Sequence, residues 1–462
     1  MIKLWTVSIL AMLCLRQPIF GQDSIPDGKK MNLLSFFQEG KVRGHSRTFF
    51  MATDNQEGLT DYYSLASGAG LSYESRPVHG FSIGFRGFFI FNLASSDLST
   101  PDPLTGSISR YELGNFDLSN PNKRSDFDRL EHLFVKFKSG QTRIVIGRQE
   151  IKTPFLNSQD GRMSPSLVEG LWIETKATEW AQIKAGWLWS MSPRSTFDWF
   201  GGHRSVGVQP MGTGIDGTKA DYRDKLTGQG LGIFHVELKP MKNWTTELWS
   251  YYADRLLALQ FGQMIYRLPF ANQKNMVFGL QYGYQQSLQK ADPNKNIYEY
   301  YATPDHKSSV ISGQIGYKNS RSFLSINHTR ISNLGRFLFP REWGVDPYFT
   351  FLRRERIEGS GGTRAWTLKY DLSLRKNLHL ESGVSRVEMP AIKDSKLNKY
   401  SMPDYTQVNL GLKWRPKGFW DGIELYGLVV HKINQNEEEI SLRSTINRVE
   451  MTNYNLVINF EF

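Results

Sequence analysis

Apolar and polar residues alternate with a period of two along most of this chain. In residues 81–91, the apolar residues at odd positions share one face, and Arg86 points to the other. Successive side chains of a β-strand point to opposite sides of a sheet, so this alternation predicts strands. The same pattern recurs at residues 181–189, 366–372 and 408–415. We therefore predict an all-β protein.

Segments with this pattern are long enough to cross a membrane. A strand of about ten residues spans a bilayer at a tilt of roughly 45°, whereas strands of soluble proteins average about five or six residues. We place eighteen strands near residues 43–54, 62–74, 81–92, 130–139, 142–150, 168–177, 180–190, 228–239, 244–254, 256–267, 275–286, 308–318, 321–331, 363–374, 377–388, 404–415, 421–432 and 451–462.

The connections between these strands alternate in length. Tight turns such as 138–141 and 318–321 alternate with long segments such as 93–129 and 332–362. Outer-membrane barrels have short periplasmic turns and long outer loops, although the connection 254–256 is too short for its expected outer side. A soluble sandwich also alternates, but strand length and this order favour a transmembrane antiparallel β-barrel of eighteen strands, with loops folded into the lumen.

The chain does not contain the long apolar segment that a transmembrane helix requires. After the first twenty residues, no stretch approaches roughly 18 consecutive apolar residues. The mean hydropathy of −0.42 suits a barrel, in which lipid-facing and lumen-facing residues alternate. The segment before the first strand is too short to be the plug domain of a TonB-dependent transporter.

The first residues have the features of a secretory signal. Lys3 precedes an apolar segment at residues 4–15, and Gly21 is a small residue that suits the end of a cleavage site. Cys14 is the only cysteine, so the mature protein would have no disulfide and no cysteine-bound metal. The expected division is a signal peptide at 1–21, a lead-in segment at 22–42 and the barrel at 43–462.

The C-terminal strand carries the sharpest local signal. Apolar residues at 454, 456, 458, 460 and 462 share one face, and the sequence closes on Phe462. A terminal aromatic of this kind resembles the signal read by the outer-membrane assembly machinery, whereas the alternative is an ordinary soluble edge strand. With the signal peptide, this strand predicts the outer membrane of a Gram-negative bacterium as the location.

The positive charge of the chain narrows the range of partners. The formal net charge is +11, and it falls to +9 if Lys3 and Arg16 leave with the signal peptide. Such an excess attracts anions. For an exported protein we expect small solutes and lipopolysaccharide as partners rather than nucleic acid, and we predict no cofactor or metal.

Two long connections carry the charges that we expect to narrow the lumen. Loops that fold into a barrel form its constriction, and their charged side chains set its selectivity. The segment 150–168 is stiffened by Pro154 and Pro165, and 333–362 is rich in aromatic residues, which favours packing over disorder. The alternative for each is an outer loop that binds lipopolysaccharide or faces water. The predicted constriction residues are Asp160, Arg162, Arg341, Glu342, Asp346 and Arg353.

A second set of basic residues falls on the strand face opposite the apolar one. Because a charge facing lipid costs roughly 2–4 kcal/mol at the bilayer midplane, this parity places them in the lumen. Lumenal acids at Glu174, Glu237 and Asp371 partly offset them, so strong anion selectivity does not follow. The predicted lumenal basic residues are Arg86, Lys136, Arg143, Lys184, Lys369 and Lys413.

The third long connection carries a spaced motif made of Gly147, Pro154, Asp160, Arg162, Pro165 and Gly170. This motif resembles the third-loop region of the OprD family of substrate-selective porins, and residues 36–50 and 364–371 are similar to other family segments. The stretch 93–129 and the fourth loop match no family segment. The resemblance implies eighteen strands, one lumen per chain and loops three and seven folded into a narrow eyelet. It also implies basic residues that guide carboxylate solutes.

These observations predict a porin for passive, partly selective diffusion of amino acids, short peptides, organic acids or similar carboxylates. One alternative is a barrel for hydrophobic substrates, which would need an apolar lumen. Another is a surface adhesin or structural barrel without an open pore, acting through loops 93–129 and 191–227. A third is a lipid-modifying enzyme with a Ser–His pair. The histidines are scattered one per strand, so we do not expect an enzyme.

Overall fold

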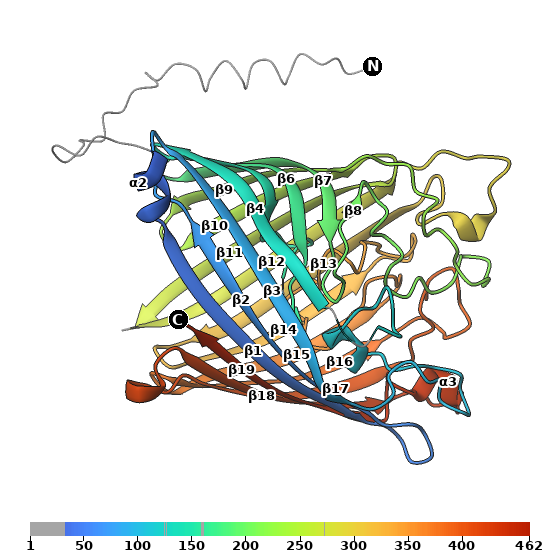
Figure 1. Ribbon diagram of the computed structural model, residues 1–462. Helices are drawn as coiled ribbons and strands as arrows, with labels where there is room; N and C mark the ends of the chain where they lie inside the picture. The colour runs from blue at the N-terminus through green and yellow to red at the C-terminus, as the bar shows by residue number, and fades with distance from the viewer. Residues whose placement is uncertain (1–32, 124, 126, 159–160, 272) are drawn as a thin grey trace.

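The computed structural model describes residues 33–123, 125, 127–158, 161–271 and 273–462, which form one closed antiparallel barrel (Figure 1). Each barrel strand pairs with its neighbour along the chain, and β1 (Lys41–Asp54) pairs with β19 (Met451–Glu461) to close the circle. The predicted signal peptide lies outside the described residues. Apart from the two-residue β8, the sheet holds eighteen strands, so the predicted fold is confirmed.

The intervening strands are β2 (Tyr62–Glu74), β3 (Phe81–Ser95), β4 (Phe127–Ser139), β5 (Thr142–Gln149), β6 (Leu167–Thr178), β7 (Ala181–Ser192), β8 (Phe200–Gly201), β9 (Leu231–Met241), β10 (Trp244–Ala253), β11 (Leu257–Ala271), β12 (Lys274–Ser287), β13 (Lys307–Lys318), β14 (Ser322–Ile331), β15 (Arg364–Arg375), β16 (Leu378–Glu388), β17 (Tyr405–Trp414) and β18 (Ile423–Asn434). The helical turns are α2 (Leu33–Gln38), η1 (Glu112–Asn115), η2 (Ile297–Glu299), η3 (Gly418–Trp420) and α3 (Leu442–Thr445). Among the described residues, none of the helices has the length and apolar character to cross a membrane.

The two ends of the barrel differ in the length of their connections. Short turns, α2 and the C-terminus lie at the left end of Figure 1, and the long loops lie at the right. The connection between β10 and β11 is indeed tight, although it lies at the loop end. We name the outer connections L2 (residues 96–126), L3 (150–166), L4 (193–230), L5 (254–256), L6 (288–306), L7 (332–363), L8 (389–404) and L9 (435–450).

The strands face outward with apolar side chains and inward with polar ones. Ile326 and Leu410 are exposed on the outside, whereas Ser325 and Asn327 are buried on the lumen side. A closed barrel pairs every strand edge, so that its backbone groups are satisfied within hydrocarbon. The alternation in the sequence therefore reflects two environments, lipid and lumen, on either side of one sheet.

A β-bulge near the outer end of β4, opposite the middle of β3, shapes the lumen there. Arg86 pairs with His132 and Gly87 pairs with Leu130, which leaves Glu131 as the extra residue. Such a bulge re-aims side chains locally. Here it places Arg129 and Glu131 inside together, where their side chains form a buried ion pair of 3.2 Å.

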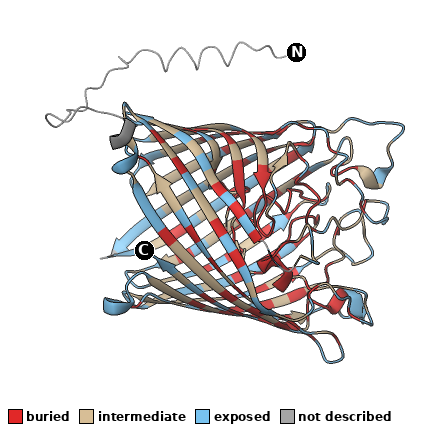
Figure 2. Ribbon diagram, in the orientation of Figure 1, coloured by how far each residue is buried: buried red, intermediate tan, exposed pale blue. Residues whose placement is uncertain are grey.

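The apolar interior of the molecule lies inside the barrel, where the loops enter it. Figure 2 shows the buried residues gathered among the inward-folded loops rather than along the turn end. One cluster surrounds Phe155 of L3 and Phe339 of L7. A second joins Tyr111 and Phe116 of L2 to strands that include β1 and β19. The loops thus form a packed partial plug within the wall.

Candidate functional site

L3 and L7 are joined to each other inside the lumen. The Asn157 side chain donates a hydrogen bond of 3.1 Å to the carbonyl of Val345, and its backbone N–H donates one of 3.1 Å to the carbonyl of Trp343. The ring of Phe155 is fully buried and lies 5.0 Å from that of Phe339, centroid to centroid. The two loops that the sequence singled out therefore form one unit, which narrows the barrel.

This unit is fixed to one side of the wall. Phe155 packs edge-on against Tyr251 of β10 at 5.7 Å and against Phe261 of β11 at 5.1 Å between ring centroids. Aromatic pairs in this geometry are favourable beyond the area that they bury. The open space consequently lies toward the opposite side of the barrel, along β1, β18 and β19.

A second attachment comes from Arg129 of β4. Its guanidinium donates hydrogen bonds to the carbonyls of Pro165 in L3, at 2.7 Å, and Thr196 in L4, at 3.2 Å. It also bonds the hydroxyl of Ser164. The buried pair with Glu131 keeps this charge compensated. Arg129 thus ties two loops to the wall, and the sequence analysis did not identify it.

Three cavities with partly shared linings lie inside the described part of the barrel. The outer cavity, of about 470 Å³, is enclosed by L2, L3, L4, L7, L8 and L9. The inner cavity, of about 820 Å³, runs along β1, β3, β18 and β19. The side cavity, of about 620 Å³, lies over β15, β16 and β17. Arg162 and Arg354 line both the outer and the inner cavity, so these two side chains lie where the two cavities adjoin.

Arg162 is held at the constriction by its backbone. Its φ of 53° lies in the left-handed region, which is uncommon for a residue other than glycine. Arg47 of β1 donates a hydrogen bond of 2.5 Å to its carbonyl. Burial lowers the pKa of Arg162 to about 10, and nearby Glu112 opposes this shift, so the side chain remains a cation at neutral pH.

Arg354 of L7 lines the same two cavities as Arg162. It too has a left-handed backbone, with a φ of 70°, and the Lys432 ammonium donates a hydrogen bond of 2.8 Å to its carbonyl. Its guanidinium bonds the side-chain oxygens of Asn455, at 2.5 Å, and Asn453, at 3.4 Å, both on β19. These uncharged amides orient the guanidinium.

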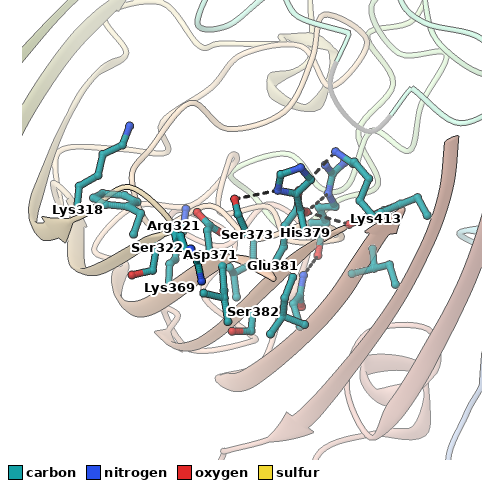
Figure 3. A pocket seen from close by; sticks show the side chains of 18 of the residues that line it. Lys318, Arg321, Ser322, Lys369, Asp371, Ser373, His379, Glu381, Ser382 and Lys413 are labelled. Atoms are coloured by element: carbon teal, nitrogen blue, oxygen red, sulfur yellow. Dashed lines mark hydrogen bonds and ion pairs between the residues drawn. The ribbon is translucent and has the colours of Figure 1, made fainter. Parts of the chain in front are cut away.

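The side cavity gathers charged side chains from neighbouring strands, as Figure 3 shows for Lys369, Asp371, Glu381 and Lys413. Glu381 is the centre of this group. Its carboxylate lies 3.6 Å from the Lys413 ammonium and 3.7 Å from the Arg353 guanidinium. It also accepts a hydrogen bond of 3.2 Å from the Tyr426 hydroxyl. Glu381 is therefore a local counter-charge to the basic residues around it.

The structure separates the predicted constriction residues into two groups. Arg162 and Arg353 line cavities, as does Arg341, which pairs with Glu358 at 2.8 Å. Glu342 and Asp346 are instead buried and accept backbone hydrogen bonds, from Gly207 at 3.0 Å and from Ile357 at 2.7 Å respectively. Burial raises the pKa of both carboxyls. Asp160 lies outside the described residues.

The predicted lumenal basic residues also occupy different surroundings. Arg86 lines the inner cavity, Lys369 the side cavity, and Lys413 both. Lys136 pairs with Glu74, and Arg143 pairs with Glu174 at 3.3 Å. Lys184 lies beside His235 in the pairing of β7 with β9.

Several cavity-lining residues were not identified from the sequence. Many of them lie on L2 and L4, for which the sequence showed no resemblance to a family segment, and on L9. L2 carries Ile108, Tyr111, Leu113 and Phe116, and the argument from aromatic content that identified L7 would also have identified L2. The basic residues of the inner and outer cavities that were missed are Arg47, Arg110, Arg194, Lys219, Arg354, Arg356, Arg415 and Arg448.

A closed outer-membrane barrel with inward loops and a basic constriction defines the class of a porin. A family model described as outer membrane porin, OprD family, matches residues 35–377, and the chain belongs to this family. The structure is similar to crystal structures of three Pseudomonas aeruginosa proteins: OccK9 (OpdG), with 13% identity and a TM-score of 0.70, OccK8 (OprE), with 14% and 0.70, and OpdK with vanillate, with 12% and 0.69.

The first two similarities cover 93% of this chain and 99% of the other chain, and the third covers 92% and 99%. At these identities the likeness shows the fold alone. No curated protein sequence is matched. The chain is thus an outer-membrane porin of the OprD family, and the solutes that it passes have to be argued from its own residues.

Proposed function

We propose that this porin allows passive, partly selective diffusion of small polar solutes, with amino acids, short peptides, organic acids and similar carboxylates as the preferred class. The observation that carries this proposal is that Arg162 and Arg354 each line both the outer and the inner cavity. A solute moving between these cavities passes two guanidinium groups. Guanidinium binds carboxylate through paired, charge-assisted hydrogen bonds, so the passage favours anions.

The inner cavity supports partial rather than strict selectivity. Its basic lining is interrupted by carboxylates, so anions are attracted without being trapped. Conduction requires that binding be favourable enough for entry and weak enough for exit. Besides the constriction pair, its basic residues are Arg47, Arg86, Arg353, Lys413 and Arg415, and its acids are Glu150, Asp421, Glu424 and Glu461.

Two alternative functions are less well supported. An adhesin without an open pore would present L2 and L4 outward, but residues 107–118 and 207–212 of these loops include much of the outer-cavity lining. A barrel for hydrophobic substrates would need an apolar passage, whereas all three cavities are lined by charged side chains.

An enzyme is the remaining alternative, and one contact bears on it. The Ser373 hydroxyl lies 3.0 Å from Nδ1 of His379, its direct partner across β15 and β16. In hydrolases a carboxylate orients the histidine through its other ring nitrogen. The hydrogen bonds of the described residues include none from this ring to a carboxylate. We therefore interpret the pair as a polar cross-strand contact and the chain as a channel.

The membrane partners remain part of the proposal. Phe462 is exposed and its ring stacks on that of Phe460 at 5.3 Å between centroids, which suits recognition by the assembly machinery before insertion. Exposed basic residues of L6, such as Lys290, suit contact with lipopolysaccharide phosphates.

Conductance of the purified protein in planar bilayers tests the proposed function. We expect discrete ohmic steps and, across a KCl gradient, a reversal potential that indicates an anion preference of about twofold or more. A preference for cations would contradict the basic passage. Silent bilayers together with binding to cell surfaces would favour the adhesin.

A further inference from the structure

Arg194 is a buried guanidinium that the proposed constriction does not explain. It follows the end of β7, lines the outer cavity and is only 9% exposed. Its Nη1 is buried and has no hydrogen-bond partner among the described residues. A buried charged group without a partner is costly. This atom therefore indicates that the outer cavity takes up a ligand that provides the missing hydrogen-bond acceptor.

The charges nearest to Arg194 add to this cost. Its pKa is lowered well below the ordinary value, first by burial and then by the neighbouring cations Arg356, Arg162 and Arg341. Glu342 acts in the opposite sense, but its carboxylate already accepts the backbone N–H groups of Gly207 and Gln209. Like charges repel strongly where water is excluded, and a bound anion would relieve this repulsion.

The outer cavity as a whole holds far more basic than acidic side chains. Among its described lining residues the one acid is Glu355, and burial raises the pKa of that carboxyl to about 8, so it is largely protonated at neutral pH. The inner and side cavities, in contrast, contain several carboxylates. The basic residues of the outer cavity are Arg110, Arg162, Arg194, Lys219, Arg341, Arg354, Arg356 and Arg448.

Most of these cations are oriented by uncharged groups. The Arg448 guanidinium donates to the carbonyl of Tyr400 at 2.7 Å, and that of Arg110 to the carbonyl of Asn447 at 3.3 Å. Arg356 donates to the carbonyl of Arg341 at 3.4 Å. Arg341 is instead paired with Glu358 and stacked over Tyr400. Arg110, Arg356 and Arg448 are thus held in place by carbonyl groups rather than by carboxylates.

We propose that the outer cavity is a binding site for multiply charged anions, that is, small solutes with two or more carboxylate or phosphoryl groups. Arg162, Arg194 and Arg356 would hold these groups above the constriction. One carboxylate is satisfied by one or two guanidinium forks, which is fewer than the cavity supplies. Apolar side chains on the L2 side, including Tyr111 and Leu113, provide a surface for the carbon skeleton. This inference rests on the proposed porin function and specifies its preferred solutes.

Blocking of the KCl current by anions added on the loop side tests this site. Acetate, succinate and inorganic pyrophosphate are compared at constant ionic strength, on the native protein, Arg194→Gln and Arg356→Gln. Arg204→Gln is the matched control, because Arg204 lies on the same loop and is exposed. Arg194→Lys retains the charge but loses the fork.

We expect the native channel to be half-blocked by succinate or pyrophosphate at a concentration about tenfold lower than by acetate. Arg194→Gln and Arg356→Gln should raise that concentration about fivefold or more for the multiply charged anions and less than about twofold for acetate. Arg204→Gln should have no effect, and Arg194→Lys an intermediate one. A stronger response to pyrophosphate than to succinate assigns the phosphoryl class, and the reverse assigns polycarboxylates.

Equal blocking by acetate and by the multiply charged anions would overturn this inference, as would an equal change for all three anions in Arg194→Gln. Either result leaves the porin function intact, provided that the channel still conducts and prefers anions. Failure of the porin function has a different signature, which is absence of conductance steps or preference for cations in the native protein.

Discussion

The guanidinium of Arg47 on β1 donates a hydrogen bond of 2.5 Å to the backbone carbonyl of Arg162 in L3. A residue of the barrel wall thereby fixes the backbone of a constriction residue that has a left-handed conformation, with a φ of 53°. The side chain that fixes this backbone, Arg47, is itself charged and also lines the inner cavity. Removing it should change the geometry of the pore as well as its electrostatics.

Replacing Arg47 by Met should loosen L3 at Arg162. A hydrogen bond from a charged group contributes about 1.5–3 kcal/mol, so its loss should let the loop sample other positions. We expect larger open-channel noise and a changed single-channel conductance in planar bilayers. Arg43→Met, at an exposed position of the same strand, is the control. Identical traces for the native protein and Arg47→Met would show that the bond does not hold the loop.

Replacing Arg162 by Ala should weaken the passage of carboxylates relative to neutral solutes. The variant removes one of the two guanidinium groups shared by the outer and inner cavities, and we expect the relative rate to fall by up to about tenfold. Liposome swelling with a monocarboxylate and a neutral sugar of similar size measures the ratio. Arg162→Lys should retain part of the preference, and equal loss for both solutes would contradict the basic constriction.

Anion preference should decline as the pH rises through about 8. Burial raises the pKa of Glu355 to about 8, so this carboxyl is neutral below that pH and adds a negative charge to the outer cavity above it. Reversal potentials measured from pH 6 to pH 9.5 should show the decline, and Glu355→Gln should flatten it. A profile that is the same in the variant would assign the titration to another group.

The same shift has a consequence for stability. Because the pKa of Glu355 is higher in the folded protein than in the unfolded chain, the folded state binds more protons between the two values. The contribution of Glu355 to stability is therefore full below the unfolded pKa and is lost as the pH rises through about 8. Glu355→Gln should reduce the loss of thermal stability between pH 6 and pH 9.

Replacing Glu381 by Gln should increase anion selectivity. The variant removes the carboxylate that lies 3.6 Å from Lys413 and 3.7 Å from Arg353, and it leaves these cations without that counter-charge. We expect the reversal potential in a KCl gradient to shift toward that of chloride. Glu179→Gln, at an exposed turn position, should behave as the native protein. An unchanged potential in Glu381→Gln would mean that the side cavity is not on the ion path.

Replacing Phe155 by Ala should detach the joined L3 and L7 from the wall. Removal of a fully buried Phe ring costs about 3–5 kcal/mol, and this ring contacts both Tyr251 and Phe261. The barrel strands do not depend on this ring, so the protein should still fold and conduct, with a larger conductance and with L3 open to protease. Phe419→Ala, at an exposed turn, is the control, and protection of L3 equal to that of the native protein would refute this attachment.

The strands could be predicted from the sequence because their signal is local. Ile326 between Ser325 and Asn327 reports lipid on one side and lumen on the other, whatever the rest of the chain does. The same logic placed Arg86 on the face opposite Phe81, Phe85, Phe89 and Phe91. It could not detect the bulge at Glu131, because an extra residue in one strand is defined only by its partner strand.

The constriction was predicted only in part, because a charged residue does not reveal its partner. Glu342 and Asp346 look like pore residues in the sequence, but they bind backbone N–H groups of Gly207 and Ile357. Arg194 and Arg354, in contrast, line the outer cavity. Which charges face the passage depends on contacts between distant loops, and these contacts leave no periodic pattern in the sequence.

The route for solutes is eccentric, and this has a consequence for biogenesis. It runs beside β1 and β19, whose pairing closes the barrel, with Arg47 on one of these strands and the amides that hold Arg354 on the other. When β1 pairs with β19, the wall beside this passage is completed, and the last unpaired strand edges are satisfied. Closure of the barrel and completion of the wall of this passage therefore depend on the same strand pairing.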